Sequence, residues 1–465
     1  MLPIVSTIAT GMTMGYSAVL LPQLWRINAT GISSMNVTRL KRSLATGSDD
    51  PTITSTHEES WIAASAAIAM VPGCWISTLL MDKLGRKSAF MIINPIFALG
   101  WNILAFANEF TMLIVGRVLC GFSVGLLGAT SPVYILEITH PHLRGLLLAC
   151  LSLAVALGIL SSHVLGTWLH WRLTAHLCGL IPILCFIFGY FVPETPSWLL
   201  KHDSQVAAFN TWQFLKGKDS SMEFANLNSD IHCNHNDEEK SWRELYLVKP
   251  FLMPLFIICV FAFTSQFSGI NVVTFYCVKM LTDIVGTDNA YLATMLLDCV
   301  RVIFSIVACW LTKRCSRRLL TNISGFGTAL TLFALSACLY SDYDQPWLSI
   351  VFLFIYICTV SLGLVPLPWL LCAELFPDAS TRALGSGLSA GFAFICFFGA
   401  VKTGPIALEV ILPHGTFTVY GTIALLGTVF LHFCLPETKD KTSDDIKNEF
   451  MGINTDVAPK KVDRY

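Results

Sequence analysis

The sequence predicts an all-α membrane protein, with twelve transmembrane helices in two parallel-repeat six-helix bundles. Of its 465 residues, 54% are hydrophobic and only 13% are charged. Soluble globular proteins average about 45–50% apolar and about 25% charged residues. Twelve separate apolar stretches approach or exceed the roughly 20 residues that a helix needs to cross a bilayer. The net charge of −1 excludes the basic field typical of nucleic-acid-binding proteins.

The predicted spans are continuously apolar rather than alternating, which indicates helices and not barrel strands. They cover residues of about 2–24, 60–81, 88–107, 111–136, 146–168, 173–192, 251–279, 289–311, 319–340, 347–372, 383–406 and 415–435. The first run has no basic region before it and no small-residue cleavage site after it. We therefore interpret it as a transmembrane helix and not as a signal peptide.

Lysine and arginine in the short loops predict the orientation, because cytoplasmic loops carry the excess of both. One set of short loops holds Lys83, Arg86, Lys87, Arg144, Lys313, Arg314, Arg317, Arg318 and Arg382. The opposite set holds only Arg172, Lys279 and Lys402. The first set is thus predicted to be cytoplasmic, which places both termini in the cytoplasm of a multi-pass plasma-membrane protein.

The long loop of about 25–59 is predicted to be extracellular, although it carries several basic residues. It contains two acceptor sequons, which begin at Asn28 and Asn36. Glycosylation is expected at both, because such sequons are modified on the outer side. The sequon at Asn322 falls at an inner helix start and is expected to stay unmodified.

An internal repeat divides the chain into two halves. Residues 82–87 correspond to 313–318; Glu137 and Arg144 correspond to Glu374 and Arg382; and residues 193–195 correspond to 436–438. Such a duplication is typical of transporters that rock around a site at the middle of the membrane. The predicted domains are an N-terminal bundle (1–192), a cytoplasmic linker with short helices (193–250), a C-terminal bundle (251–435) and a cytoplasmic tail (436–465).

Acidic and basic residues recur at the predicted inner helix ends. They are Asp82, Arg86, Glu137, Arg144, Glu194, Glu374, Arg382 and Glu437. Carboxylate–guanidinium pairs between the halves would hold the inner side shut, and their release would open it. The alternative is simple anchoring by positive charge, which requires no acids.

Polar residues inside the spans predict a substrate site. Gln266 and Asn271 are amides in an apolar span, and amides both donate to and accept from hydroxyl-rich ligands. Trp369 offers a ring on which the apolar face of a sugar can stack. Residues that would loosen or bend these two spans lie close by: Gly269, Pro366 and Pro368.

Three charged residues lie within predicted spans, where charge is costly and indicates a function by default. Arg117 either supports neighbouring helices or contacts substrate. Asp298 and Arg301 are three residues apart, so they share a helix face and can pair. A purely structural pair is the alternative.

The chain resembles the sugar porter family of the major facilitator superfamily, in the style of insect facilitated trehalose and hexose transporters. The matching motifs are residues 82–87, Gly116-Arg117 with Gly121 and Gly125, Pro132-Val133-Tyr134 with Glu137, Arg144-Gly145, residues 193–196, residues 266–271 with Tyr276, Pro368-Trp369 with Glu374, Arg382, and residues 436–439. The resemblance implies facilitative uniport of a small sugar by alternating access. It also implies sugar contacts at Gln266, Asn271 and Trp369, and a gate at Tyr276.

Proton-driven relatives carry an aspartate after a Gly-Tyr pair in the first span. This chain has Ser17 at that position. A serine hydroxyl cannot exchange a proton near neutral pH, so the resemblance implies transport without proton coupling.

Several positions depart from the family pattern. Ser265 stands where a second amide is usual, and Ser152, Arg301 and Ser361 replace polar ligands of glucose facilitators. Ser152 and Ser265 are still expected to belong to the substrate-binding residues, as is Tyr276. The motif positions Lys313, Ser316 and Ser197 also differ from the family's usual residues. Two alternatives therefore remain open: a carrier of another polyol or a charged organic solute, and a sugar sensor that does not transport.

No nucleotide-binding phosphate loop and no hydrolytic or redox constellation is visible, so neither an enzyme nor a cofactor is expected. The cluster of residues 232–235 lacks a recognised zinc spacing, and no metal site is predicted. The expected partners are a small sugar and the lipid bilayer, with no nucleic acid and no obligate protein partner.

Overall fold

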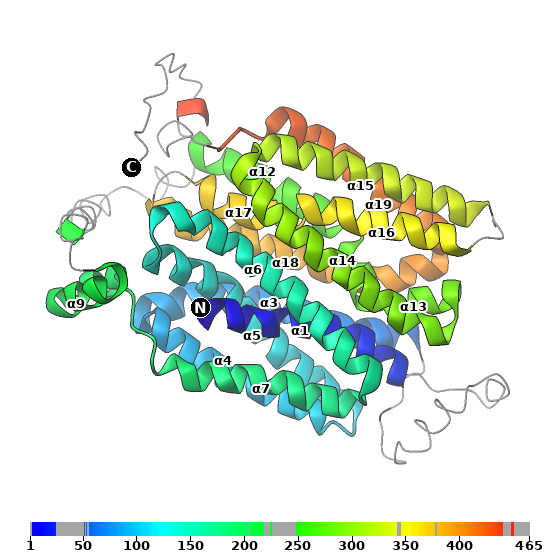
Figure 1. Cartoon of the computed structure of the whole chain (residues 1–465), viewed down its shortest axis with the longest axis horizontal. Coiled ribbons are helices and arrows are strands. Elements are labelled where there is room, and N and C mark those ends of the chain that lie inside the picture. The colour runs from blue at the N-terminus through cyan, green and yellow to red at the C-terminus, as the bar shows by residue number, and fades with distance from the viewer. Residues whose placement is uncertain are drawn as a thin grey trace.

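The computed structural model is helical through nearly all the residues that it describes (Figure 1). These are residues 2–24, 55–202, 204–217, 248–341, 346–376 and 379–439, with a few residues at 51, 53, 224–225 and 448–450. Twelve helical segments in this part of the chain are long and apolar enough to cross a membrane. The twelve-helix prediction is therefore confirmed.

The helices fall into two sets that we name by their order in the chain. The N-terminal set comprises α1 (Leu2–Leu24), α3 (Thr56–Leu84), α4 (Arg86–Ala105), α5 (Phe110–Ile138), α6 (Pro141–Trp168) and α7 (Trp171–Gly189). The C-terminal set comprises α12 (Lys249–Gln266), α13 (Ile270–Val285), α14 (Thr287–Arg314), α15 (Arg317–Tyr340), α16 (Pro346–Leu362), α17 (Leu367–Glu374), α18 (Ala379–Val410) and α19 (Leu412–Cys434). The short helices α8 (Pro196–Lys201) and α9 (Gln205–Lys216) lie between the sets in sequence.

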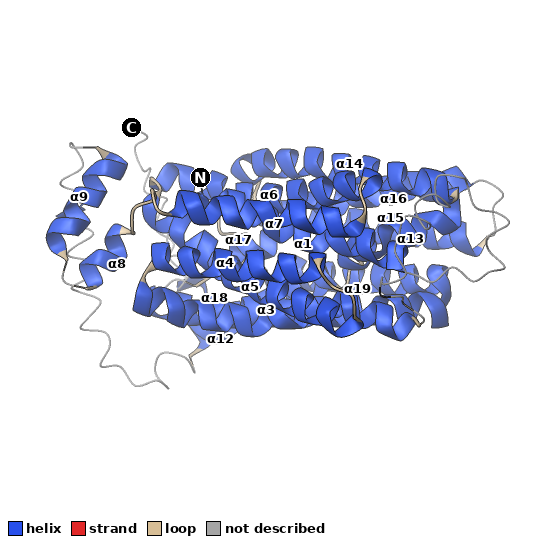
Figure 2. Ribbon diagram, turned by 90° about the horizontal axis from the view of Figure 1, so that it is seen from below, coloured by secondary structure: helices blue, strands red, loops and turns tan. Residues whose placement is uncertain are grey.

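The long helices run roughly along one axis, and α8 and α9 project beyond one end of the bundle (Figure 2). We call this the linker end; α1 begins there. The opposite end, where α1 ends and α3 begins, is the distal end. Most of the packing between the two sets is made by three helix pairs, α3 with α18, α6 with α14, and α1 with α13, and α17 also contacts α6.

Two spans of the C-terminal set are interrupted. The first break separates α12 from α13 and contains Gly269, whose φ of 91° lies in the left-handed region that favours glycine. A Cβ at Gly269 would lie 2.7 Å from Cδ2 of Tyr420. The second break, residues 363–366, separates α16 from α17 and ends at Pro366. Interrupted helices of this kind are tolerated at membrane depth where they line a cavity.

Small residues allow α3 and α5 to approach closely. A Cβ at Gly121 would lie 2.0 Å from the carbonyl oxygen of Ala66, and one at Gly125 would lie 2.1 Å from that of Met70. Both glycines therefore have a packing role, as in other tightly crossed membrane helices.

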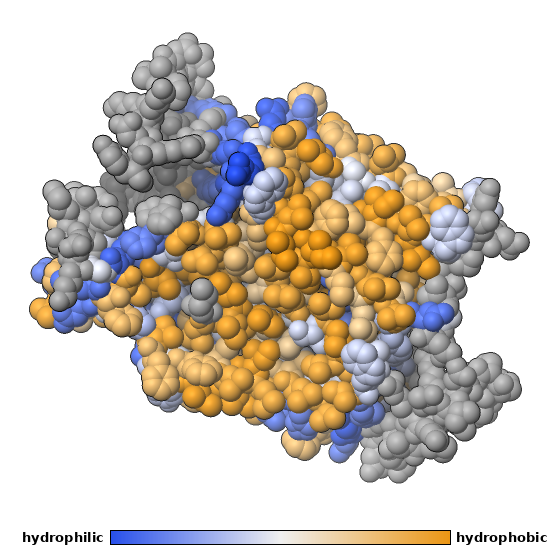
Figure 3. Space-filling view, in the orientation of Figure 1, coloured by the Kyte–Doolittle hydropathy of each residue, from blue (hydrophilic) through white to orange (hydrophobic). Residues whose placement is uncertain are grey.

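The face of the bundle drawn in Figure 3 is mostly apolar between its two ends. Large side chains such as Leu79, Leu426 and Phe433 are at least 62% exposed. Contiguous apolar surface of this extent marks a face that contacts lipid.

Candidate functional site

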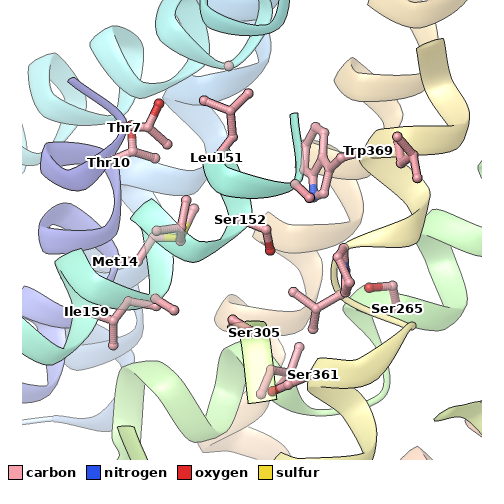
Figure 4. Close-up of a pocket in the computed structure, with 18 of the residues that line it drawn as sticks. Thr7, Thr10, Met14, Leu151, Ser152, Ile159, Ser265, Ser305, Ser361 and Trp369 are labelled. Atoms are coloured by element: carbon pink, nitrogen blue, oxygen red, sulfur yellow. The ribbon is translucent and has the colours of Figure 1, made fainter. Parts of the chain in front are cut away.

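A cavity of about 220 Å³ lies between the two sets (Figure 4). On the N-terminal side it is lined by the first half of α1, the second half of α5, and residues 148–159 of α6. On the C-terminal side it is lined by both broken spans, by α18, and by residues 301–312 of α14. Because α1 and α6 begin at the linker end while α5 and α14 end there, the cavity extends from mid-bundle toward the linker end.

Two predicted substrate residues meet at the first helix break. Gln266 ends α12 and Asn271 follows the first residue of α13, and the Asn271 amide nitrogen donates to Oε1 of Gln266. Both residues line the cavity. The break thus turns two amides, five positions apart, toward one space, and leaves the remaining donor and acceptor groups for a ligand.

An aromatic ring and two serine hydroxyls line the same cavity as these amides. Trp369 on α17 is 40% exposed and lines the cavity, and its ring centroid lies 5.5 Å from that of Phe394. Ser152 and Ser265 also line it, as Figure 4 shows. Tyr276 does not belong to this lining: its hydroxyl donates to the carbonyl of Val401 at 3.2 Å, which holds it between α13 and α18.

Contacts between the sets close the cavity toward the distal end. Lys279 Nζ on α13 lies 2.6 Å from Oε2 of Glu59 on α3. Lys402 Nζ on α18 donates to Ser60 Oγ at 2.8 Å and lies 4.0 Å from the ring centroid of Trp61. These contacts join α3 to α13 and to α18 on the distal side of the cavity.

A buried polar chain joins the sets nearer the middle. Nδ1 of His163 on α6 is hydrogen-bonded to Oδ2 of Asp298 on α14, and its Nε2 lies 2.9 Å from the carbonyl oxygen of Gly15 on α1. Asp298 Oδ1 lies 4.0 Å from Nη1 of Arg301. Asp298 was predicted to pair with Arg301, and His163 was not predicted to take part, although a histidine within an apolar span indicates a polar partner.

Arg117 is fully buried and lies outside the cavity lining. Its guanidinium donates to the carbonyls of Ile62 and Thr13, at 3.2 and 2.9 Å, and to Ser17 Oγ at 2.5 Å. Arg117 therefore joins α1, α3 and α5. Its partner Ser17 stands where proton-driven relatives were expected to have an aspartate. This arrangement favours structural support over substrate contact.

The charged residues at the linker end form the same pair in each set. Arg86 Nη2 lies 2.7 Å from Oε1 of Glu137, and Arg317 Nη2 lies 3.1 Å from Oε1 of Glu374. Arg317 was not among the predicted gating residues. The repeat itself contained the signal, since Arg317 occupies the position equivalent to Arg86.

Two further acids cap helices at this end. Glu194 accepts from the backbone N–H groups of Arg86 and Lys87 at the start of α4, at 2.9 and 3.0 Å. Glu437 accepts in the same way from Arg317 and Arg318 at the start of α15. Burial raises the pKa of Glu437, but hydrogen bonds from backbone N–H groups outweigh it and leave the pKa below its usual value.

Each ion pair described at the linker end joins two residues of the same set, so the lock predicted between the sets at this end stays a prediction. Asp82 is exposed, and its carbonyl accepts from the Trp198 indole at 3.0 Å. Arg144 Nε donates to the carbonyl of Thr139 at 3.4 Å. Arg382 belongs to α18, but its side chain lies outside the described residues, as do Asn28, Asn36 and the cluster 232–235.

Comparisons with known proteins identify the family. The sequence model of the family described as "Sugar (and other) transporter" matches residues 12–450. A facilitated trehalose transporter of Aedes aegypti is 32% identical over 403 residues, which is 84% of this chain and 50% of that protein. The corresponding transporter of Polypedilum vanderplanki is 30% identical over 451 residues, or 95% of this chain and 86% of that protein. The chain thus spans about half the length of some relatives that it matches.

The fold is also that of solved transporters. A structure of a major facilitator superfamily proton:xylose symporter, XylE, superimposes with a TM-score of 0.77 at 19% identity, covering 97% of this chain and 98% of that one. Its inward-open structure gives a TM-score of 0.71 at 20% identity, over 96% and 98% of the two chains. The family comprises transporters, which agrees with the expectation that the chain is not an enzyme. A match over residues 12–450, together with this fold, places the chain in the sugar transporter family of multi-pass membrane proteins.

Proposed function

We propose that the protein carries a small sugar, such as a hexose or trehalose, down its gradient across the plasma membrane by alternating access. The observation that carries this proposal is the cavity between the two sets, which extends from mid-bundle toward the linker end and is closed distally by side-chain contacts. A cavity accessible from one side at a time is what a carrier requires, and the trehalose transport named for several relatives supports the substrate class.

The lining suits a hydroxyl-rich ligand. The amides of Gln266 and Asn271 would bind hydroxyls, and the exposed face of Trp369 would cover the apolar face of a sugar ring. Serines at positions 152 and 265 would add weaker hydrogen bonds. We place the substrate between these groups because they converge from both broken spans and from α6.

We propose that the two sets are the moving halves. In this structure the distal contacts are made, while the linker-end acids pair within their own set. Opening the distal side would break the contacts of Glu59 and His163, and the lock predicted at Arg144 and Arg382 would then form between the halves. Charged pairs exchanged in this way bias a two-state element without a net change in fold.

The direct test is tracer uptake in cells that lack endogenous sugar transport, with one hexose and trehalose as substrates. We expect saturable uptake that stops at the outside concentration. Normal surface expression without uptake of either sugar would contradict the proposal and favour the non-transporting sensor.

The proposed orientation places the linker end in the cytoplasm. It predicts glycans on Asn28 and Asn36 and none on Asn322. Asn322 lies near the start of α15, and its amide nitrogen is 2.9 Å from Nδ1 of His432 on α19. Mobility shifts after glycosidase treatment of single Asn→Gln variants measure this. A glycan on Asn322 would invert the orientation.

A further inference from the structure

Arg301 is the one charged side chain among the described residues that line the cavity. It is 8% exposed, and its Nε atom is buried without a hydrogen-bond partner. A guanidinium offers five N–H donors in a planar fork. Burying such a group in a membrane protein without acceptors is costly, so its position on the cavity wall indicates a ligand.

The second buried arginine of the membrane region shows what a structural role requires. The guanidinium of Arg117 donates to backbone and hydroxyl oxygens on two neighbouring helices and is absent from the cavity wall. Arg301 makes no comparable hydrogen bonds in the described part of the chain. The two arginines therefore differ in kind: the donors of Arg117 are used within the fold, whereas those of Arg301 remain available.

Asp298 does not complete the site. Its Oδ1 lies 4.0 Å from Nη1 of Arg301, which is too long for a hydrogen bond. Its Oδ2 is hydrogen-bonded to His163. Asp298 thus lowers the electrostatic potential around Arg301 without occupying the guanidinium fork.

We propose that Arg301 binds the carboxylate of an acidic sugar, such as a hexuronate, whose ring lies against the amides of Gln266 and Asn271. This inference rests on the proposed function and names the substrate class of the same cavity. A carboxylate matches the planar fork with two parallel hydrogen bonds. A monoanion fits better than a phosphate dianion, because the cavity wall supplies one cation and Asp298 lies close to it.

The test compares binding of glucose, glucuronate and glucose 6-phosphate to the purified protein in detergent. We expect glucuronate to bind roughly 10- to 150-fold more tightly than glucose, the range for a hydrogen bond to a charged group. Arg301→Asn should remove this preference, so that glucuronate binds no more tightly than glucose, and Arg301→Lys should retain part of it. Arg172→Asn removes a cation at the distal end, outside the cavity lining, and should leave the preference unchanged.

The outcomes separate the two proposals. Glucose binding at least as tight as glucuronate binding would overturn this inference and leave sugar transport standing. A preference that survives in Arg301→Asn would assign the anion to another group, and tighter binding of the phosphate would refute the carboxylate. If none of the three ligands, nor trehalose, binds or is transported, the proposed function fails as well. If Arg301→Asn does not fold, the ratio of glucuronate to glucose affinity in the wild type and in Arg301→Lys still tests whether Arg301 binds the carboxylate.

A second readout follows from charge. Transport of a monoanion without a co-ion moves net charge, so glucuronate should evoke a current in voltage-clamped cells that express the protein. Glucose should evoke none. Uptake of labelled glucuronate without current would overturn its transport as the bare anion.

Discussion

The hydrogen bond between His163 and Asp298 should determine how often the distal side opens. It joins α6 to α14 between side chains that are 2% and 5% exposed. A hydrogen bond to a charged group contributes about 1.5–3 kcal/mol, so its loss in His163→Ala should raise the ratio of distally open to closed molecules roughly 10- to 150-fold. Removing the imidazole also frees the carbonyl of Gly15, but leaves the linker-end ion pairs unchanged.

Thiol labelling from outside the cell measures this ratio. A cysteine at Ser152 lies on the cavity wall and reacts with a membrane-impermeant reagent only when the distal side is open. We expect faster labelling of Ser152→Cys when it is combined with His163→Ala. Ser161→Ala is the matched control, because its hydroxyl bonds within α6 to the carbonyl of Leu157 at 2.7 Å.

An unchanged labelling rate in the His163→Ala background would refute the reasoning. It would show that the other distal contacts suffice to hold the closed state. Faster labelling in the Ser161→Ala control would show instead that any substitution in α6 loosens the bundle.

Four further predictions follow from the same geometry. Gln266→Ala or Asn271→Ala should weaken sugar affinity about 2- to 12-fold at unchanged surface level, the range for a neutral hydrogen bond, as measured by uptake kinetics. Arg144→Ala should favour the state open at the linker end and so weaken an outward-facing inhibitor; unchanged binding and transport would refute the lock. Uptake should be insensitive to a protonophore, because Ser17 has no titratable proton; a sugar-evoked proton current would contradict this. Because the pKa of Glu437 is lowered in the folded protein, its ionised carboxylate stabilises the fold above the usual carboxyl pKa of 4.5, and this stabilisation is lost as the pH falls through the pKa of the folded state. Glu437→Gln should therefore lower the melting temperature at pH 7 and not at pH 3.

The breaks in the spans could be predicted because their causes are local. Gly269 allows the left-handed conformation that ends one helix, and Pro366 with Pro368 disrupts the other. The apolar runs located the twelve spans, but α3 (Thr56–Leu84) extends beyond the predicted 60–81 at both ends, where polar and charged residues continue the helix. The amides at 266 and 271 could be assigned to one site because the break between them is short.

The partners of buried charges could not be predicted, since they depend on which helices touch. Asp298 and Arg301 share a face, yet the closest partner of Asp298 comes from α6, 135 positions away in sequence. Likewise, the position of Arg117 within its apolar span did not indicate that α1 and α3 both supply hydrogen-bond acceptors to its guanidinium. Pairs within one helix can be predicted from the spacing of three or four residues, whereas pairs between helices can be identified only when the packing of the helices is known.

The two sets contribute unequally to the cavity, although their linker ends are near copies. The amides, Trp369 and Arg301 all come from the C-terminal set. The N-terminal set provides threonines, serines and apolar side chains to the wall, together with His163 and Glu59 as closing contacts. If the halves move as proposed, the substrate stays with the C-terminal set while the N-terminal set opens and closes around it. Substitutions in α12, α13, α14 and α17 that remove polar ligands should then change affinity, whereas substitutions at the closing residues of α3 and α6 should change the distribution between states.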